Sequence, residues 1–285
     1  MNEIKNTVFT GERAEFAAKN TKYISCTFED GESPLKHSED IIAEGCDFRW
    51  KYPFWYSKGI TVHGCTFHEM GRAGVWYSKD IRFSDVKYIA PKGFRRCEGL
   101  RLEKVFLPFA QETLWECRDV TLKNVHAEGD YLAMNCDGMD VDGLTLDGNY
   151  CFDGAKNVTI RNSVLNSKDA FWNSENITAE NCKIYGEYLG WNSKNLRLIN
   201  CEIESLQGLC FIEGLYMRGC TLGGTPLCFE YCSGIDAQIT GEIESVKNPI
   251  SGVIRADSIG KVIAEPERVD VGRTKMIVGK SSDIN

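Results

Sequence analysis

Proline and long apolar runs are scarce in this 285-residue sequence. It holds 7 Pro beside 27 Gly, and no stretch approaches the roughly 20 consecutive apolar residues that a membrane-spanning helix needs. The opening residues MNEIKNTVFTGERAEF also lack the apolar core of a signal peptide. A hydrophobic share of 42% excludes a disordered or collagen-like chain. We therefore expect a folded, cytoplasmic protein that does not bind membranes.

Positive charge is also in short supply. The chain carries 33 Lys+Arg against 41 Asp+Glu, which gives a net charge of -8. Such a charge repels a polyphosphate backbone unless the basic residues gather on one face. Nucleic acid is therefore not an expected partner.

The 13 cysteines form no C-x-x-C pair, and their number is odd. In a reducing compartment this pattern favours neither a disulfide framework nor a zinc ribbon. Most of them instead recur at two fixed positions of a repeat. One position holds Cys26, Cys46, Cys65, Cys182, Cys201 and Cys220, and the other holds Cys97, Cys117, Cys136 and Cys232. We interpret them as small packing residues.

The repeat itself begins at apolar residues spaced 19 to 21 positions apart. These starts are Ile41, Ile60, Ile81, Leu100, Val120, Met139, Val158, Ile177, Leu196, Leu215 and Ile235. A sustained period of this length is typical of a solenoid, whose coils bury their apolar sides by stacking on their neighbours. We therefore expect one β-helix domain over residues 1–285.

Within each repeat, apolar residues recur two, five and seven positions after the start. Gly, Asn or Asp lies just before each start and, except at Lys104, again four positions after the starts from Ile41 to Leu215, where a sharp corner requires positive φ. These offsets fit neither a hexapeptide nor a pentapeptide solenoid. They predict an all-β, single-stranded, right-handed parallel β-helix with three faces and about 11 coils over 21–252. Residues 1–20, with an amphipathic helix or turn at 12–20, and residues 253–285 are expected to cap the ends.

The third face carries an unusual column of large aromatic residues. It contains Trp55, Trp76, Trp115, Trp172 and Trp191, with Arg95 at the same position of another coil. The residue before each is suited to burial, so strand alternation predicts that the indoles point outward. A row of outward aromatic rings can hold sugar rings, while Lys92, Arg95 and Glu187 beside it bind polar groups. The alternative is a covered face or a sealed second core.

Several carboxylates accompany this column. Glu112 and Asp130 lie at nearly the same position of adjacent coils, which is close enough for a glycosidase-type pair of acid and nucleophile or base. Lys168 and Glu187 show the same spacing, and a simple cross-strand ion pair is the alternative for them. Asp153 and Asp169 complete the candidate catalytic residues.

Other roles at this face remain open. Lys92 and Arg95 can hold a uronate carboxylate, or supply the base of a β-elimination. No cofactor is predicted, although Asp130, Asp153 and Asp169 are an alternative set of calcium ligands. The four His mostly fall off this face, so no histidine base or metal triad is expected.

Eleven short strings point to a family resemblance. They are GESPLK (31–36), KYPFWYS (51–57), AGVWYS (73–78), APKGFRRC (90–97), ETLWEC (112–117), GDYLAMN (129–135), GNYCFDG (148–154), SKDAFWNS (167–174), GEYLGWNS (186–193), QGLCFIEG (207–214) and SVKNPISG (245–252). From about residue 7 to 260 the chain resembles a largely bacterial family known as domain of unknown function 3737. The resemblance implies a right-handed β-helix of the pectin-lyase-like superfamily and no established activity. The polygalacturonase pattern and the pectate-lyase calcium signature are not found in the sequence.

We expect a carbohydrate-active protein that holds an oligosaccharide on the third face. The most specific form of this hypothesis is an oligosaccharide that contains uronates. The protein would cleave the glycosidic bond by hydrolysis or elimination. The alternative is a non-catalytic β-helix that uses the same aromatic face to bind a glycan or a protein. A homodimer that buries Trp115 and Trp172 in a symmetric contact is a further alternative.

Overall fold

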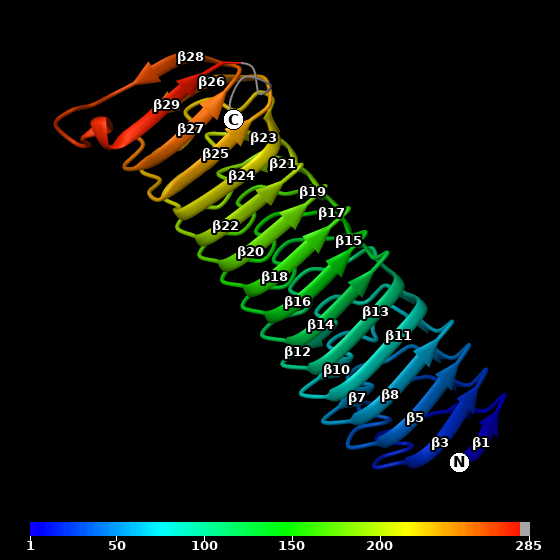
Figure 1. The fold of residues 1–285 in the computed structure, drawn as a ribbon. Coiled ribbons are helices and arrows are strands. Elements are labelled where there is room, and N and C mark those ends of the chain that lie inside the picture. Colours follow the sequence, from blue (N-terminus) through cyan, green and yellow to red (C-terminus); the bar gives the residue numbers. More distant parts are fainter. Residues whose placement is uncertain (280–285) are drawn as a thin grey trace. The chain divides into compact units, whose positions relative to one another are not determined.

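The computed structural model describes residues 1–279, which form parallel β-strands and a single 3₁₀ turn, η1 (Val271–Arg273). They divide into two compact units, of which the first is Met1–Asp147 and the second begins at Gly148. Each unit is a stack of coils whose successive strands lie parallel and side by side (Figure 1). Within the described range, no helix has the length and apolar character needed to cross a membrane. The predicted all-β parallel solenoid is confirmed.

In the first unit, every coil contributes one long strand to a parallel ladder. These strands are β1 (Asn2–Lys5), β3 (Lys19–Ile24), β5 (Glu39–Glu44), β8 (Lys58–His63), β11 (Lys79–Tyr88), β13 (Glu98–Leu107), β14 (Arg118–Lys123) and β16 (Asp137–Asp142). A second ladder runs through β2 (Val8–Phe9), β4 (Thr27–Phe28), β6 (Asp47–Phe48), β9 (Thr66–Phe67), the ends of β11 and β13, β15 (His126–Glu128) and β17 (Thr145–Asp147). A third ladder joins β7 (Phe54–Trp55), β10 (Val75–Trp76) and β12 (Phe94–Arg95).

The second unit continues the same plan. Its first ladder contains β18 (Lys156–Arg161), β20 (Glu175–Glu180), β22 (Lys194–Ile199), β24 (Glu213–Leu222), β25 (Ile235–Ile239), β27 (Gly252–Ala256) and β29 (Thr274–Val278). Its other strands are β19 (Val164–Asn166), β21 (Lys183–Glu187), β23 (Glu202–Leu206), β26 (Glu242–Lys247) and β28 (Ser258–Ile263). The third side of these coils consists of turns.

The corners between the ladders adopt the left-handed conformation that the sequence predicts. Gly45, Gly64 and Asn124 have φ of 57°, 59° and 51°. Asn and Gly tolerate this region because a short polar side chain or none avoids the Cβ clash. In the second unit the corner asparagines also bond to one another, from Asn176 to Asn157 at 3.0 Å and from Asn195 to Asn176 at 2.9 Å. The corners therefore hold the coils in register.

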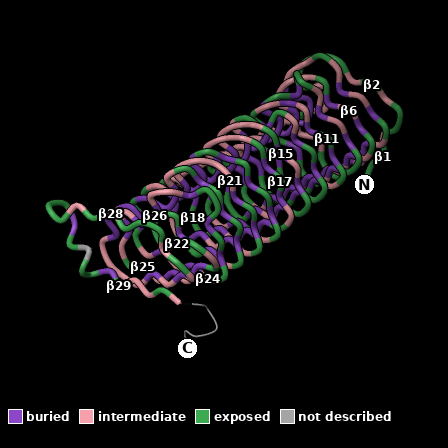
Figure 2. Tube along the Cα trace, turned by 90° about the horizontal axis from the view of Figure 1, so that it is seen from above, coloured by how far each residue is buried: buried purple, intermediate pink, exposed green. Residues whose placement is uncertain are grey.

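In the interior, similar residues of successive coils stack on one another. Phe28, Phe48, Phe67 and Tyr88 form a continuous column with ring centroids 4.6 to 5.0 Å apart. All 13 cysteines are buried and free of disulfides. Along the strands, buried residues alternate with exposed and intermediate ones (Figure 2). The interpretation of the cysteines as packing residues agrees with this arrangement.

The coil count is higher than predicted, about 15 turns instead of about 11. At the N-terminus, β1 pairs with β3, and residues 12–17 form turns, not a helix, with Arg13 and Glu15 N–H groups bonded to the next coil. At the other end, β27 and β29 extend the ladder past residue 252. The terminal coils were missed because their start positions hold Asn2, Gly252 and Thr274, which break the apolar column. Residues 280–285 of the expected C-terminal cap lie outside the described range.

Burial should make the thiols unreactive in the folded protein. It raises the pKa of Cys151 to about 12, and a protonated, enclosed thiol is a poor nucleophile. We expect a thiol reagent at about pH 8 to label no cysteine under native conditions and all 13 after unfolding in guanidinium chloride. Mass spectrometry of the labelled protein measures this directly, and rapid native labelling at either cysteine column would contradict the packing shown here.

Candidate functional site

The tryptophan column lies outside the core. All five indoles, those of Trp55, Trp76, Trp115, Trp172 and Trp191, are half-buried. The residues that precede them, such as Phe54, Val75 and Phe171, are fully buried. The outward orientation is therefore confirmed, and the alternative of a sealed second core is wrong.

The indoles are nevertheless arranged differently from open sugar platforms. Trp55 and Trp76 stack with centroids 5.1 Å apart and planes 7° apart, so each covers a face of the other. Their Nε1 atoms donate hydrogen bonds to the carbonyls of Ala73 and Lys92, at 2.6 and 3.0 Å. Parallel strands lie about 4.8 Å apart, a spacing that brings outward rings on successive coils into contact. A ligand at this pair therefore meets ring edges, whereas the sequence suggested open faces.

Arg95 continues the column between two indoles. Its guanidinium lies 4.6 Å from the Trp76 ring centroid and 4.4 Å from that of Trp115. Its Nη2 contacts Glu112 Oε2 at 3.3 Å, and Lys92 Nζ contacts the same oxygen at 3.0 Å. The buried Nε of Arg95 has no hydrogen-bond partner within the described residues. Glu112 thus positions two cations beside the aromatic column.

Glu112 and Asp130 do lie on adjacent coils, since the Glu112 N–H donates to the Asp130 carbonyl at 3.0 Å. The Glu112 carboxylate, however, is engaged by Lys92 and Arg95. Their pairing as acid and nucleophile stays a prediction.

A cavity of about 290 Å³ opens beside the column in the first unit. We call it the aromatic–basic cavity, and its walls are Tyr52, Trp55, Arg72, Ala73, Trp76, Pro91 and Lys92. Three aromatic side chains and Pro91 line it, and two cations supply its charge. The sequence places Trp55, Trp76 and Lys92 in the site and Arg72 only in the polar column beside it; Tyr52 and Pro91 were missed.

One turn of unusual length shapes this cavity. Residues 68–74 connect the second and third ladders in seven residues, where the coils on either side use five, 49–53 and 89–93. Gly71 closes a tight turn onto the His68 carbonyl at 2.8 Å. At Gly74 an added Cβ would lie 2.2 Å from the Tyr88 hydroxyl, so only glycine fits there. The 21-residue step from Ile60 to Ile81 was the available sequence signal for this feature.

The charges around the cavity break a regular pattern. On both units, cations usually pair with an acid one coil away, as in Lys79–Glu98 at 2.7 Å and Lys168–Glu187 at 3.1 Å. Arg72 follows Lys51 and precedes Lys92 in one column, and both of these lysines have carboxylate partners. The exposed Arg72 guanidinium has no ion pair or hydrogen bond within residues 1–279. An unpaired cation thus lines the aromatic–basic cavity.

The second unit holds a different group of candidate residues around Asp169. This side chain is only 7% exposed, and its Oδ1 has no hydrogen-bond partner among the described residues. Burial, followed by the nearby charge of Glu187, raises the pKa of Asp169, whereas Lys168 and a hydrogen bond from Tyr150 oppose the rise. Glu187 itself pairs with Lys168, as the ion-pair interpretation predicts. The arrangement places a carboxyl with a raised pKa beside one that is paired with a cation.

The remaining residues of the second unit surround this group. Asp153 accepts a hydrogen bond from Asn173 at 2.9 Å. Trp172 and Trp191 lie 5.9 Å apart with planes tilted by 36°, a looser contact than that of Trp55 and Trp76. Across residues 1–279, no three or more His, Cys, Asp or Glu side chains are arranged to hold a metal ion. A calcium role for the predicted aspartates therefore has no assembled ligand set to support it.

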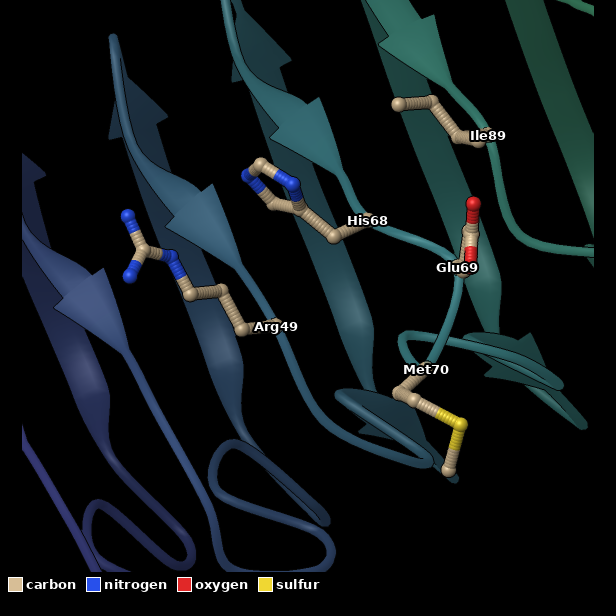
Figure 3. A pocket seen from close by; sticks show the side chains of 5 residues that line it. All are labelled: Arg49, His68, Glu69, Met70 and Ile89. Carbon is tan, nitrogen blue, oxygen red and sulfur yellow. The ribbon is translucent and has the colours of Figure 1, made fainter.

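Another hollow of about 390 Å³ lies in the first unit (Figure 3). Arg49, His68 and Ile89 project into it from three successive coils, with Glu69 and Met70 on the long turn. Arg49 pairs with Glu29 at 2.8 Å, and His68 pairs with Asp47 at 2.6 Å. Its cationic groups are thus already satisfied, which makes this hollow a weaker candidate than the aromatic–basic cavity.

Stacked parallel coils with an outward aromatic column define the class of this protein as a parallel β-solenoid. The chain belongs to the family DUF3737, described as a protein of unknown function, whose model matches residues 2–277. The family resemblance drawn from the sequence strings is confirmed, while membership of the pectin-lyase-like superfamily stays a prediction. No curated protein sequence matches the chain.

Similar solved structures include several β-helix proteins. The A-module of the mannuronan C-5 epimerase AlgE4 from Azotobacter vinelandii is 9% identical, covers 93% of this chain and 90% of its own, and gives a TM-score of 0.35. The surface adhesin PfbA of Streptococcus pneumoniae is 10% identical over 93% and 74% of the two chains, with a TM-score of 0.32. The catalytic domain of a GH87 alpha-1,3-glucanase is 9% identical over 98% and 65%, with a TM-score of 0.39. At these values the similarities assign no function to this chain.

The raised pKa of Asp169 predicts a specific effect on stability. The wild type loses stability as the pH rises from the ordinary aspartate value of 3.8 through the folded-state pKa, because a buried group must then ionise. We expect Asp169→Asn to raise the free energy of unfolding at pH 7, and the gain to vanish near pH 3. Urea denaturation across this pH range measures the difference.

Asp236→Asn is the matched control with the opposite sign. Arg218 and then Arg255 lower the pKa of Asp236, so its stabilising effect is present at neutral pH and is lost on acidification. This variant should therefore be less stable than the wild type at pH 7 and equal to it at low pH. If the stability difference from the wild type had the same sign and the same pH dependence in both variants, the assignment for Asp169 would be contradicted.

Proposed function

We propose that the protein binds acidic glycans, with a uronate residue seated in the aromatic–basic cavity. The observation that carries this proposal is the unpaired guanidinium of Arg72 among the rings of Tyr52, Trp55, Trp76 and Pro91. An arginine fork forms two parallel hydrogen bonds to a carboxylate, and the rings contact the apolar edge of a sugar. The cavity volume of about 290 Å³ suits one sugar unit of a longer chain.

The charges near the cavity favour an acidic sugar over a neutral one. Lys92 lies at the cavity wall and is held by Glu112, which also contacts Arg95. Glu112 is engaged by these two cations, and Arg72 has no acidic partner within residues 1–279. A neutral glycan would leave this guanidinium unpaired when the ligand displaces water, and leaving a charged donor unpaired is costly.

Substitution of Arg72 tests the proposed site. A hydrogen-bonded charged group contributes about 1.5 to 3 kcal/mol, so we expect Arg72→Gln to weaken binding of trigalacturonate by roughly tenfold or more. Isothermal titration calorimetry with the full chain measures the change. Maltotriose, which carries no carboxylate, should bind the wild type far more weakly than trigalacturonate.

Arg49→Gln is the matched control, because Arg49 is an exposed arginine in the same unit that is already paired with Glu29. It should leave trigalacturonate binding unchanged. Equal binding of the two trisaccharides, or equal losses in the Arg72 and Arg49 variants, would overturn the proposal.

A second candidate function, glycan cleavage, is favoured by the group around Asp169 in the second unit. Cleavage requires a protonated acid for the glycosidic oxygen and an ionised base for the attacking water. Burial raises the pKa of Asp169, and Glu187 forms an ion pair with Lys168 at 3.1 Å. In this proposal Asp169 donates its proton as the C–O bond breaks, and Glu187 takes a proton from water as the new bond to the sugar carbon forms.

The cleavage proposal predicts products and a defined pH profile. General acid catalysis contributes about 10² to 10⁴ in rate, so Asp169→Asn should lower turnover of an acidic oligosaccharide by that factor. Wild-type turnover should fall as the pH rises through the pKa of Asp169. Mass spectrometry of oligogalacturonides incubated with each protein is the measurement. If the wild type binds them and releases no products, binding alone is the function.

Two further expectations remain as proposals. We propose a reducing, cytoplasmic location, which is compatible with 13 buried free cysteines. Self-association through Trp115 or Trp172 stays an alternative use of the aromatic column.

A further inference from the structure

A second charged hollow lies in the first unit on the outer face of β8, β11, β13 and β14. It measures about 420 Å³, and its polar lining is Thr61, Arg82, Ser84, Arg101, Glu103, Thr121 and Lys123, so three cations face one carboxylate. None of these residues belongs to the aromatic–basic cavity. The hollow therefore needs an explanation of its own.

Two arginines meet directly in this ladder. Arg82 on β11 pairs in register with Arg101 on β13, and Thr61 and Thr121 flank them at the same position. Strands lie about 4.8 Å apart, and like charges directly opposite each other on a sheet are destabilising. Lys58 and Lys79 also pair in register, but each has an acidic partner, Asp80 at 3.9 Å and Glu98 at 2.7 Å. The Arg82–Arg101 pair differs because Arg82 has no such partner among the described residues.

The two arginines are held differently. Arg101 donates to the hydroxyl of Thr121 and contacts Asp119 Oδ2 at 3.4 Å, both on the side away from Arg82. Arg82 is exposed and makes no ion pair or hydrogen bond in the described part of the chain. Lys123 adds a further cation, partly balanced by Glu103 at 3.5 Å. The side of the hollow next to Arg82 is left with uncompensated positive charge.

We propose that this hollow binds a phosphate group, either free or as the monoester of a small molecule, between Arg82 and Arg101. A phosphate carries about two negative charges at neutral pH and accepts hydrogen bonds in several directions. It thereby satisfies two guanidinium groups at once and offsets their mutual repulsion. The hydroxyls of Thr61 and Ser84 lie in the same lining and supply further donors. This inference is independent of the proposed glycan binding.

Titration of the ¹⁵N-labelled full chain with inorganic phosphate and with glucose 6-phosphate tests the site. At constant ionic strength we expect saturable amide shifts confined to β8, β11, β13 and β14, and a rise in Tm with ligand, because binding to the folded state stabilises it. Arg82→Gln should weaken the apparent affinity about tenfold or more and remove most of the rise in Tm. Sodium chloride at equal ionic strength should produce neither effect. A preference for glucose 6-phosphate identifies the monoester as the ligand, and equal affinity identifies the phosphate group alone.

Lys79→Gln is the matched control, since Lys79 lies on the same strand as Arg82 and pairs with Glu98. It should bind phosphate like the wild type, and so should Arg72→Gln, which removes the unpaired cation of the aromatic–basic cavity. Equal responses of the wild type and Arg82→Gln, shifts reproduced by chloride, or stronger binding of galacturonate than of phosphate would each overturn the proposal. Without ligand, Arg82→Gln should unfold at the same or a higher temperature, so lost binding is distinguishable from misfolding.

Discussion

Hydrogen bonds from each coil to the next are the constraint on which the whole structure depends. The N–H of Phe54 donates to the carbonyl of Gly74, and the N–H of Tyr56 donates to that of Trp76. This pairing fixes the distance between equivalent side chains at about 4.8 Å, whatever those side chains are. Side chains at equivalent positions of successive coils must therefore be able to pack against one another. Phenylalanines inside and indoles outside satisfy this requirement by stacking, and cations on the surface satisfy it by alternating with acids.

Much of the fold follows from this constraint and was predictable from the sequence. The Gly, Asn and Asp corners adopt positive φ where the spacing places them, because few other residues accept that conformation. The inward cysteines and the buried residues before each tryptophan also lie where strand alternation predicts. The terminal coils escaped detection because an apolar column was the criterion, and the backbone pairing of β1 with β3 does not require one.

The candidate site was only partly predictable, for two physical reasons. The sequence places the indoles outward, but it does not reveal whether their faces are open, and ring stacking covers those of Trp55 and Trp76. Whether a charged side chain is free to bind a ligand depends on its ion-pair partner. That partner lies some 20 residues away in the sequence, and the side-chain rotamers decide which acid contacts which cation. Glu112 thus binds two cations. Asp169 is distinguished from other aspartates by burial alone, a property that its sequence neighbours do not report.

The long turn at 68–74 shows how this architecture changes locally. Its two additional residues bulge outward between Phe67 and Val75, and both of those residues keep their places in the ladders. Both hollows that adjoin the turn depend on it, since Met70 lines one and Arg72 lines the other. A small insertion or deletion here can create or erase a recess while every strand stays paired. In such a scaffold, a change in a single loop can alter the surface chemistry, and its effect on folding stability is confined to that loop.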